Sequence, residues 1–176
     1  MKTYAYILVK LLILSFCIHA EAANLTIDKV APAFEIKTFS GASITSASSK
    51  GRILVINFWA TWCAPCQNEM PELEKFYRQY HDQGVDVIAI SLDDKSDLGA
   101  VKNAMKSFSF PFAMTDDTDM RRFGRIWRVP VTFVIDRNGV LRHNGWEGEP
   151  VVNAAILQKI VTPLLAPKTM EPVANH

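Results

Sequence analysis

Two cysteines separated by two residues, Cys63 and Cys66, are the side chains in this sequence best suited to chemistry. They follow an apolar run at 53–59 and precede a segment whose apolar residues recur every three or four positions, so we expect them at a helix N-terminus. The partial positive charge of a helix N-terminus stabilises a thiolate relative to a thiol. The pattern therefore predicts a disulfide-exchange site, with Cys63 exposed as the nucleophile and Cys66 as the resolving thiol.

A structural disulfide or half of a zinc site is the alternative interpretation of this pair. Zinc takes four ligands in a structural site, and His81, His143 and His176 show no spacing typical of a ligand pair. We therefore expect no metal at Cys63 and Cys66, and the exchange reaction that we predict needs no cofactor.

Glu69 lies three residues after Cys66, on the same side of the expected helix. A carboxylate there would raise the pKa of the Cys66 thiol and could relay its proton. A solvent-exposed helix glutamate is the alternative that spacing alone leaves open.

The size and charge of the chain limit what it can be. Its 176 residues suit one domain with a full core, and its formal net charge of +1 gives no electrostatic reason to expect a nucleic acid as partner. The composition is ordinary for a globular protein, with 49% hydrophobic residues.

The first 22 residues have the layout of a secretory signal peptide. Lysines precede a short apolar run at 11–18, and small residues follow it, so we expect residues 1–22 to be removed by cleavage after Ala22. A retained membrane anchor within residues 7–20 is the alternative, although the apolar run is shorter than the about 20 residues that a span needs. The sequence therefore predicts export to the periplasm.

Export would leave a chain in which Cys63 and Cys66 are the remaining cysteines. Two cysteines do not make the disulfide framework of a small secreted domain, so the pair is better explained by chemistry. We expect residues 23–176 to form a single domain, with a flexible tail after about residue 166, where the apolar periodicity ends.

The apolar periodicity predicts an α/β fold. Strands at 53–59 and 85–91 enclose a helix from near Cys63 to Gly84, and this βαβ unit should have parallel strands with a right-handed crossover. The other expected elements are a strand at 34–39 with a return strand at Ile44, a helix at 97–107 capped by aspartates of the run 93–97, an extended piece at 110–113, a helical turn from 116 to Gly124, a hairpin of strands at 131–136 and 140–146, and a closing helix at 152–164.

The stretch from Asn57 to Pro71, together with the later stretch from Arg128 to Phe133, resembles the thioredoxin superfamily. It is most similar to the exported TlpA/ResA/CcmG-like branch, over residues 31–165. The resemblance implies a thioredoxin-like fold, with a central mixed sheet flanked by helices, an N-terminal β extension and an inserted αβ element between Val85 and Phe112.

The resemblance also implies roles for residues outside the cysteine pair. Pro130 is then a cis-proline, which would turn the backbone of Val129 toward the disulfide and let it pair with a substrate chain. Trp62 would form an apolar lip at the site together with Trp59, whose ring could instead belong to the core. These roles make Trp62, Val129 and Pro130 the expected substrate-binding residues.

Three positions depart from the patterns that the resemblance suggests. Asn57 stands where thioredoxin has a buried aspartate, so Glu69 is the candidate to replace that acid, as a glutamate does in the similar branch. Arg128 and Val131 stand where the branch usually has a small residue and a threonine. These two replacements bear on partner specificity and not on the chemistry.

The resemblance implies an exported thiol:disulfide oxidoreductase that is a monomer. Its substrates would be disulfide-bearing periplasmic proteins such as oxidised apocytochrome c, and a membrane thiol transporter of the DsbD/CcdA type would supply electrons. Neither Ala64 nor Pro65 adds charge to the site, which favours net reduction over the alternative of a net oxidant or isomerase.

Two further activities of related proteins are less consistent with the sequence. Peroxiredoxins need a threonine three residues before the reactive cysteine, whereas Ala60 stands there and Thr61 is two residues before Cys63. Copper-binding relatives have a wider cysteine spacing and a distant histidine, a part that His143 alone could take here.

Four arginines precede Pro130 and allow two interpretations. They could dock an acidic partner surface, or they could be a solvated face that nearby aspartates balance, which we favour. The arginines are Arg121, Arg122, Arg125 and Arg128, and the aspartates are Asp116, Asp117 and Asp119.

Overall fold

The computed structural model describes residues 25–147 and 151–165. The predicted signal peptide at 1–22, the alternative anchor at 7–20 and the tail after residue 166 lie outside the described residues. Among the residues that are described, no helix has the length and apolarity needed to cross a membrane.

A five-stranded mixed sheet forms the centre of the fold, in the order β5-β4-β3-β7-β8. Strands β3 and β4 pair in parallel and confirm the predicted βαβ unit, while β7 pairs antiparallel to β3 and begins the predicted hairpin. The strands are β3 (Ile53–Trp59), β4 (Val85–Ser91), β5 (Phe112–Met114), β7 (Val131–Ile135) and β8 (Leu141–His143).

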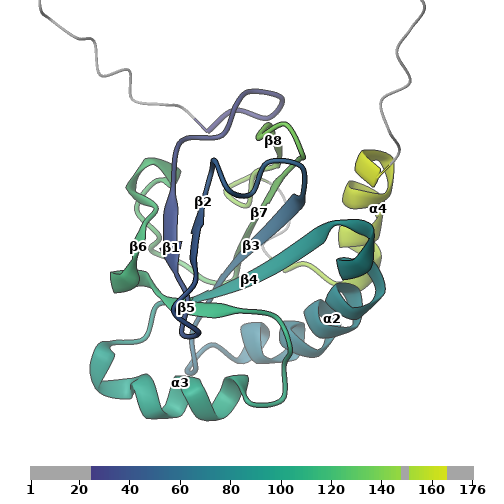
Figure 1. The fold of residues 1–176 in the computed structure, drawn as a ribbon. Helices are drawn as coiled ribbons and strands as arrows, with labels where there is room; N and C mark the ends of the chain where they lie inside the picture. The colour runs from purple at the N-terminus through teal and green to yellow at the C-terminus, as the bar shows by residue number, and fades with distance from the viewer. Residues whose placement is uncertain (1–24, 148–150, 166–176) are drawn as a thin grey trace, which may run out of the picture.

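Helices α2 (Ala64–Tyr80) and α4 (Ala154–Leu165) lie together on one side of this sheet (Figure 1). Apolar residues of both helices join one buried cluster with the inward side chains of β3 and β4, because each helix carries an apolar stripe. A single 3₁₀ turn, η2 (His81–Gln83), follows α2, and the chain then reverses at Gly84, which has a φ of 88° that few other residues adopt.

A small antiparallel sheet, in the order β2-β1-β6, confirms the predicted N-terminal β extension and lies on the other side of β3 and β4 (Figure 1). It consists of β1 (Glu35–Lys37), β2 (Ser43–Thr45) and β6 (Thr118–Asp119). Its side chains join a second buried cluster, which covers the opposite face of the central sheet. The central sheet is thus buried on both faces, as its nearly continuous apolar strands require.

The predicted helical turn from 116 to Gly124 is wrong as a single element. Strand β6 divides it into two separate 3₁₀ turns, η4 (Thr115–Asp117) and η5 (Arg121–Phe123). The pairing of Ile36 with Thr118 extends the backbone between the two turns. Sequence periodicity could not reveal this because the partner strand lies about 80 residues earlier.

The inserted αβ element is confirmed, but its predicted caps are wrong. A 3₁₀ turn, η3 (Lys95–Asp97), leads into helix α3 (Leu98–Met105), and neither turn nor helix receives a side-chain hydrogen bond at its cap. Asp93, the first aspartate of the predicted cap run, instead binds the turn that carries Cys63.

Candidate active site

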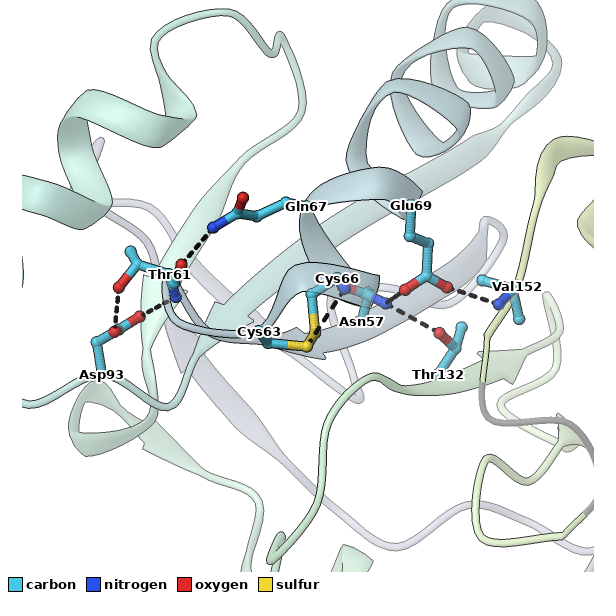
Figure 2. Close-up of a disulfide and its surroundings, with 9 residues drawn as sticks. All are labelled: Asn57, Thr61, Cys63, Cys66, Gln67, Glu69, Asp93, Thr132 and Val152. Carbon is cyan, nitrogen blue, oxygen red and sulfur yellow. Dashed lines mark hydrogen bonds between the residues drawn. A yellow bond between two sulfur atoms is a disulfide. The ribbon is translucent and has the colours of Figure 1, made fainter.

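The two cysteines form a disulfide at the N-terminus of α2, with an S–S bond of 2.05 Å (Figure 2). Cys63 is the N-cap residue, and its sulfur accepts a hydrogen bond of 3.2 Å from the backbone N–H of Cys66. This is the expected position at the positive end of the helix, where a thiolate of Cys63 would be stabilised.

The expectation that Cys63 is exposed is wrong in degree. Cys63 is 5% exposed and Cys66 is fully buried. The sulfur of Cys63 is bonded to the Cys66 sulfur and accepts the Cys66 backbone N–H, so it faces the first helical turn. Cys63 nevertheless remains the more accessible of the two sulfur-bearing residues, as a nucleophile must be.

Asp93 holds the turn before Cys63 in place (Figure 2). Its carboxylate accepts the Thr61 backbone N–H at 2.9 Å and the Thr61 hydroxyl at 2.6 Å. The Ser91 hydroxyl donates to the same carboxylate at 2.6 Å, and Gln67 on α2 donates to the Thr61 carbonyl. The hydroxyl of Thr61, which stands two residues before Cys63, is thus bound to Asp93.

The pKa of Asp93 is held below its ordinary value. Burial alone would raise it, but the hydrogen bonds from Ser91 and Thr61 outweigh burial. Asp93 is therefore an anion at neutral pH, and its charged carboxylate accepts the hydrogen bonds that fix the turn.

Glu69 lies on the other side of the disulfide and is 2% exposed, so the alternative of a solvent-exposed glutamate is wrong. One carboxylate oxygen accepts the Val152 backbone N–H at 2.7 Å, and the other accepts the Asn57 side-chain amide at 3.4 Å (Figure 2). The same amide nitrogen donates to the Thr132 hydroxyl at 3.0 Å. The asparagine that replaces thioredoxin's acid thus contacts the glutamate that we expect to substitute for it.

The pKa of Glu69 is raised to about 7. Burial is the main cause, and the hydrogen bonds from Val152 and Asn57 lower the pKa only in part. A carboxyl group with this pKa, one helical turn beyond Cys66, can take up or release a proton near neutral pH.

The Val129–Pro130 peptide bond is cis, as predicted. Val131, the next residue, pairs with Phe58 near the end of β3, so Pro130 lies at the end of the sheet where the Cys63 turn begins. Trp62 is 69% exposed, whereas Trp59 is 1% exposed and belongs to the core. The structure thus brings the predicted substrate-binding residues to the same end of the sheet as the disulfide.

Asp93, Thr132 and Val152 contribute to the site, and the sequence did not single them out. A signal for Asp93 existed, because an aspartate two residues after a buried strand lies at the same sheet end as a turn that follows the neighbouring parallel strand. Val152 contributes only its backbone N–H, which no side-chain pattern can reveal.

The basic run is balanced less evenly than expected. Arg121 pairs with Asp119 at 2.9 Å, whereas Asp116 and Asp117 pair with Lys95, at 4.0 and 3.6 Å. Arg128 makes no ion pair among the described residues and instead donates to the carbonyls of Gly145 and Trp146.

The described residues contain no group of three or more His, Cys, Asp or Glu side chains that could hold a metal ion. His143 lies on β8, which is separated from β3 by β7, and burial lowers the pKa of its imidazole. This places the histidine two strands away from the strand that leads to Cys63.

Comparison with known proteins agrees with this geometry. The model of the AhpC/TSA family matches residues 27–144. The thiol-disulfide oxidoreductase ResA of Bacillus cereus is 34% identical over 122 residues, which are 68% of this chain and 69% of that protein.

Solved structures show the same likeness. A thiol:disulfide interchange protein of the thioredoxin family from Chlorobium tepidum superposes with a TM-score of 0.65 at 30% identity, over 80% of this chain and 99% of that one. StoA from Bacillus subtilis superposes with a TM-score of 0.58 over 75% of this chain and 98% of its own, and its 22% identity shows the fold alone. The chain therefore belongs to the AhpC/TSA family, has a thioredoxin-like fold and is a thiol:disulfide oxidoreductase.

Proposed function

We propose that this protein is exported and reduces disulfide bonds of periplasmic proteins, cytochrome c maturation being the process in which it would act. The observation that carries the proposal is the Cys63–Cys66 disulfide at the N-terminus of α2, at the same sheet end as Val129 and Pro130. The signal-peptide layout of residues 1–22 and the ResA and interchange proteins among its relatives support it.

The reaction transfers two electrons from the protein to its substrate. In the reduced protein, the Cys63 thiolate attacks one sulfur of the substrate disulfide and expels the other as a thiolate, which leaves a mixed disulfide. Cys66 then loses its proton and attacks the Cys63 sulfur, which releases the second substrate thiol. The substrate gains two electrons, and the protein retains the Cys63–Cys66 disulfide that the structure contains.

Glu69 is the proposed acceptor of the Cys66 proton in the second step. Cys66 is fully buried, so its proton needs a nearby group in place of water. With a pKa of about 7, Glu69 is partly ionised near neutral pH and can accept that proton. Val129 and Pro130 would hold the substrate backbone, and the exposed ring of Trp62 would cover it.

The proposed direction of the reaction rests on the lack of charge within the motif. A strong oxidant is one whose reduced form is stabilised, and the intervening Ala64 and Pro65 offer nothing beyond the helix terminus to do so. Because the periplasm is kept oxidising, a reductase there needs electrons from across the membrane, and a DsbD/CcdA-type thiol transporter is the proposed donor. We propose that the protein works as a monomer.

Trapping experiments test the proposal. We expect Cys66→Ser to accumulate mixed disulfides with partner proteins through Cys63, and Cys63→Ser to accumulate few. The reverse result would exchange the roles of the two thiols. A reduction potential close to the about −120 mV of a strong oxidant would refute the reductase direction and favour a net oxidant or isomerase.

A further inference from the structure

Two tryptophans near the disulfide are largely exposed. Trp62 is 69% exposed and Trp127 is 72% exposed, although large aromatic side chains are usually buried in a monomer. Trp62 lies three residues after the end of β3, and Trp127 lies three residues before Pro130, which directly precedes the start of β7. Because β3 and β7 pair antiparallel at Phe58 and Val131, both tryptophans leave the sheet at the same end as Cys63.

One face of the Trp127 ring packs on other side chains. Its ring stacks on Trp146, with centroids 6.3 Å apart and planes 12° apart. The Arg128 guanidinium lies 5.7 Å from the Trp127 centroid and 5.6 Å from that of Trp146. The indole N–H of Trp146 donates to the Phe123 carbonyl at 2.8 Å, which fixes the Trp146 ring. One face of Trp127 is therefore held in place, while the rest of its surface faces solvent.

Arg128 ties this aromatic cluster to the loop before Pro130. Its guanidinium donates to the carbonyls of Gly145 and Trp146 at 3.3 and 3.2 Å. Gly145 in turn lies so close to Thr132 that a Cβ would come within 2.4 Å of the Thr132 carbonyl oxygen. These contacts fix Arg128 and Trp146, the two side chains on which the Trp127 ring packs. A ring that is already ordered loses little entropy when it binds a partner.

The charge beside Trp127 is positive. The segment 121–128 contains four arginines and no acidic residue. Arg121 pairs with Asp119, and Arg128 is bound to carbonyls, whereas Arg122 and Arg125 are exposed and make no ion pair among the described residues. Arg125 therefore offers an unpaired cation two residues from the exposed ring.

We propose that Trp127 and Arg125 select substrates in which the target cysteine is flanked by an aromatic side chain and a carboxylate. The occupant is the extended cysteine-bearing segment of the substrate protein, so this inference rests on the proposed function. A substrate chain that pairs with the Val129 backbone passes alongside Trp127, two residues away, and places its own aromatic ring on the exposed indole. Its carboxylate meets Arg125, as charge complementarity requires.

Peptide probes test the proposal on the full-length reduced protein. Each probe is a decapeptide with one cysteine, held as a mixed disulfide with glutathione. Three positions on either side of the cysteine are varied. Phenylalanine or serine is placed at one of these positions at a time, and glutamate or glutamine is placed at the remaining varied positions. The second-order rate constant of reduction is measured for the wild type, Trp127→Ala and Arg125→Gln. Val30→Ala, an exposed apolar residue bridged to Val140, and Arg122→Gln are matched controls.

For the wild type, we expect at least one phenylalanine position to accelerate reduction about tenfold over serine, which corresponds to about 1.4 kcal/mol. The wild type should also reduce probes with glutamate faster than those with glutamine, and this preference should weaken as salt is added. Trp127→Ala should abolish the phenylalanine ratio, and Arg125→Gln should abolish the glutamate preference. The two control variants should keep both preferences. If the wild type reduces every probe at one rate, or if Trp127→Ala keeps the phenylalanine ratio, the inference is wrong. Failure to reduce any probe would instead count against the proposed function.

Discussion

The disulfide lies between two nearly buried carboxylates whose pKa values move in opposite directions. Asp93 is 8% exposed and its pKa is lowered, whereas Glu69 is 2% exposed and its pKa is raised to about 7. Figure 2 shows Asp93 bound to the turn before Cys63 and Glu69 bound on the far side of Cys66. Both groups are acids in the same small region, so their immediate partners must explain the difference.

The hydrogen-bond donors around each carboxylate account for it. Asp93 receives short bonds from the Ser91 hydroxyl and from the hydroxyl and backbone N–H of Thr61. Glu69 receives one short bond, from Val152, and one long bond of 3.4 Å, from Asn57. Donors stabilise the ionised form and burial destabilises it, so the donors prevail at Asp93 and burial prevails at Glu69.

Asp93 is a structural acid, whereas Glu69 is suited to transfer a proton. Asp93 remains charged over the neutral range and fixes the geometry of the Cys63 turn. Glu69 changes its protonation state near neutral pH, which suits the group that we propose to accept the Cys66 proton.

The largest expected difference between the two carboxylates is in the pH dependence of stability. The folded pKa of Glu69, about 7, lies above the ordinary value of 4.5, so the unfolded chain ionises first as the pH rises. The stability that protonated Glu69 supports is fully present below about pH 4.5 and is lost as the pH rises through about 7, by about 3 kcal/mol in total. In denaturant titrations of the oxidised protein, Glu69→Gln should therefore gain about 3 kcal/mol relative to the wild type between about pH 4 and about pH 9.

The control for this measurement is Glu72→Gln, which removes a carboxylate from the same helix but leaves the contacts of Glu69 in place. A constant difference between Glu69→Gln and the wild type across the pH range would show that Glu69 does not have a raised pKa.

A smaller and opposite effect is expected at Asp93. Asp93→Asn replaces the charged acceptor of the hydrogen bonds from Thr61 and Ser91 with a neutral amide. The substitution should destabilise the protein by about 2 kcal/mol at neutral pH. Because the folded pKa of Asp93 is lowered, its contribution is present above the ordinary value of 3.8 and is lost as the pH falls through the folded pKa. The loss in Asp93→Asn should thus be flat above about pH 5 and shrink in acid.

Asp94→Asn is the matched control, because Asp94 is the exposed neighbouring acid and its side chain caps no helix. Denaturation by urea at several pH values measures both variants. An equal loss in the two would mean that the bonds from Thr61 and Ser91 contribute nothing specific.

The smallest expected effect is at the edge of the Glu69 network. Thr132 is fully buried, and its hydroxyl accepts a hydrogen bond from Asn57. Thr132→Val keeps the shape and removes the acceptor, so it should cost about 1 kcal/mol. Thermal unfolding measures this change, and an unchanged melting temperature would show that Asn57 is held by Glu69 alone.

The chemistry and fold were predictable where a pattern is local. The apolar run at 53–59 predicted β3, the spacing of Cys63 and Cys66 predicted the exchange pair, and the resemblance to thioredoxin-like proteins implied the cis bond before Pro130. Each of these depends on residues adjacent in the sequence or on a motif that is nearly contiguous.

The partners of the two carboxylates could not be predicted in the same way. Thr61 and Asp93 are 32 residues apart, and Glu69 and Val152 are 83 apart, so each contact depends on the finished sheet. The polar neighbours of Asp93 predict a helix cap, and only the parallel pairing of β3 with β4 brings Asp93 to the Cys63 turn.

The measurement that tests the account most directly is the pH dependence of the second exchange step. Reduced protein is mixed rapidly with an excess of a peptide disulfide, and the formation and decay of the mixed disulfide at Cys63 are followed by acid quench at a series of pH values. In the wild type, decay should accelerate through about pH 7, where Glu69 ionises.

Glu69→Gln should form the mixed disulfide at the wild-type rate and resolve it about 100-fold more slowly at neutral pH, because its amide cannot accept the Cys66 proton. Its decay should also lack the acceleration through about pH 7 that the wild type shows. If Glu69→Gln resolves the mixed disulfide with the rate and pH profile of the wild type, Glu69 does not accept the Cys66 proton and the contrast with Asp93 has no catalytic meaning.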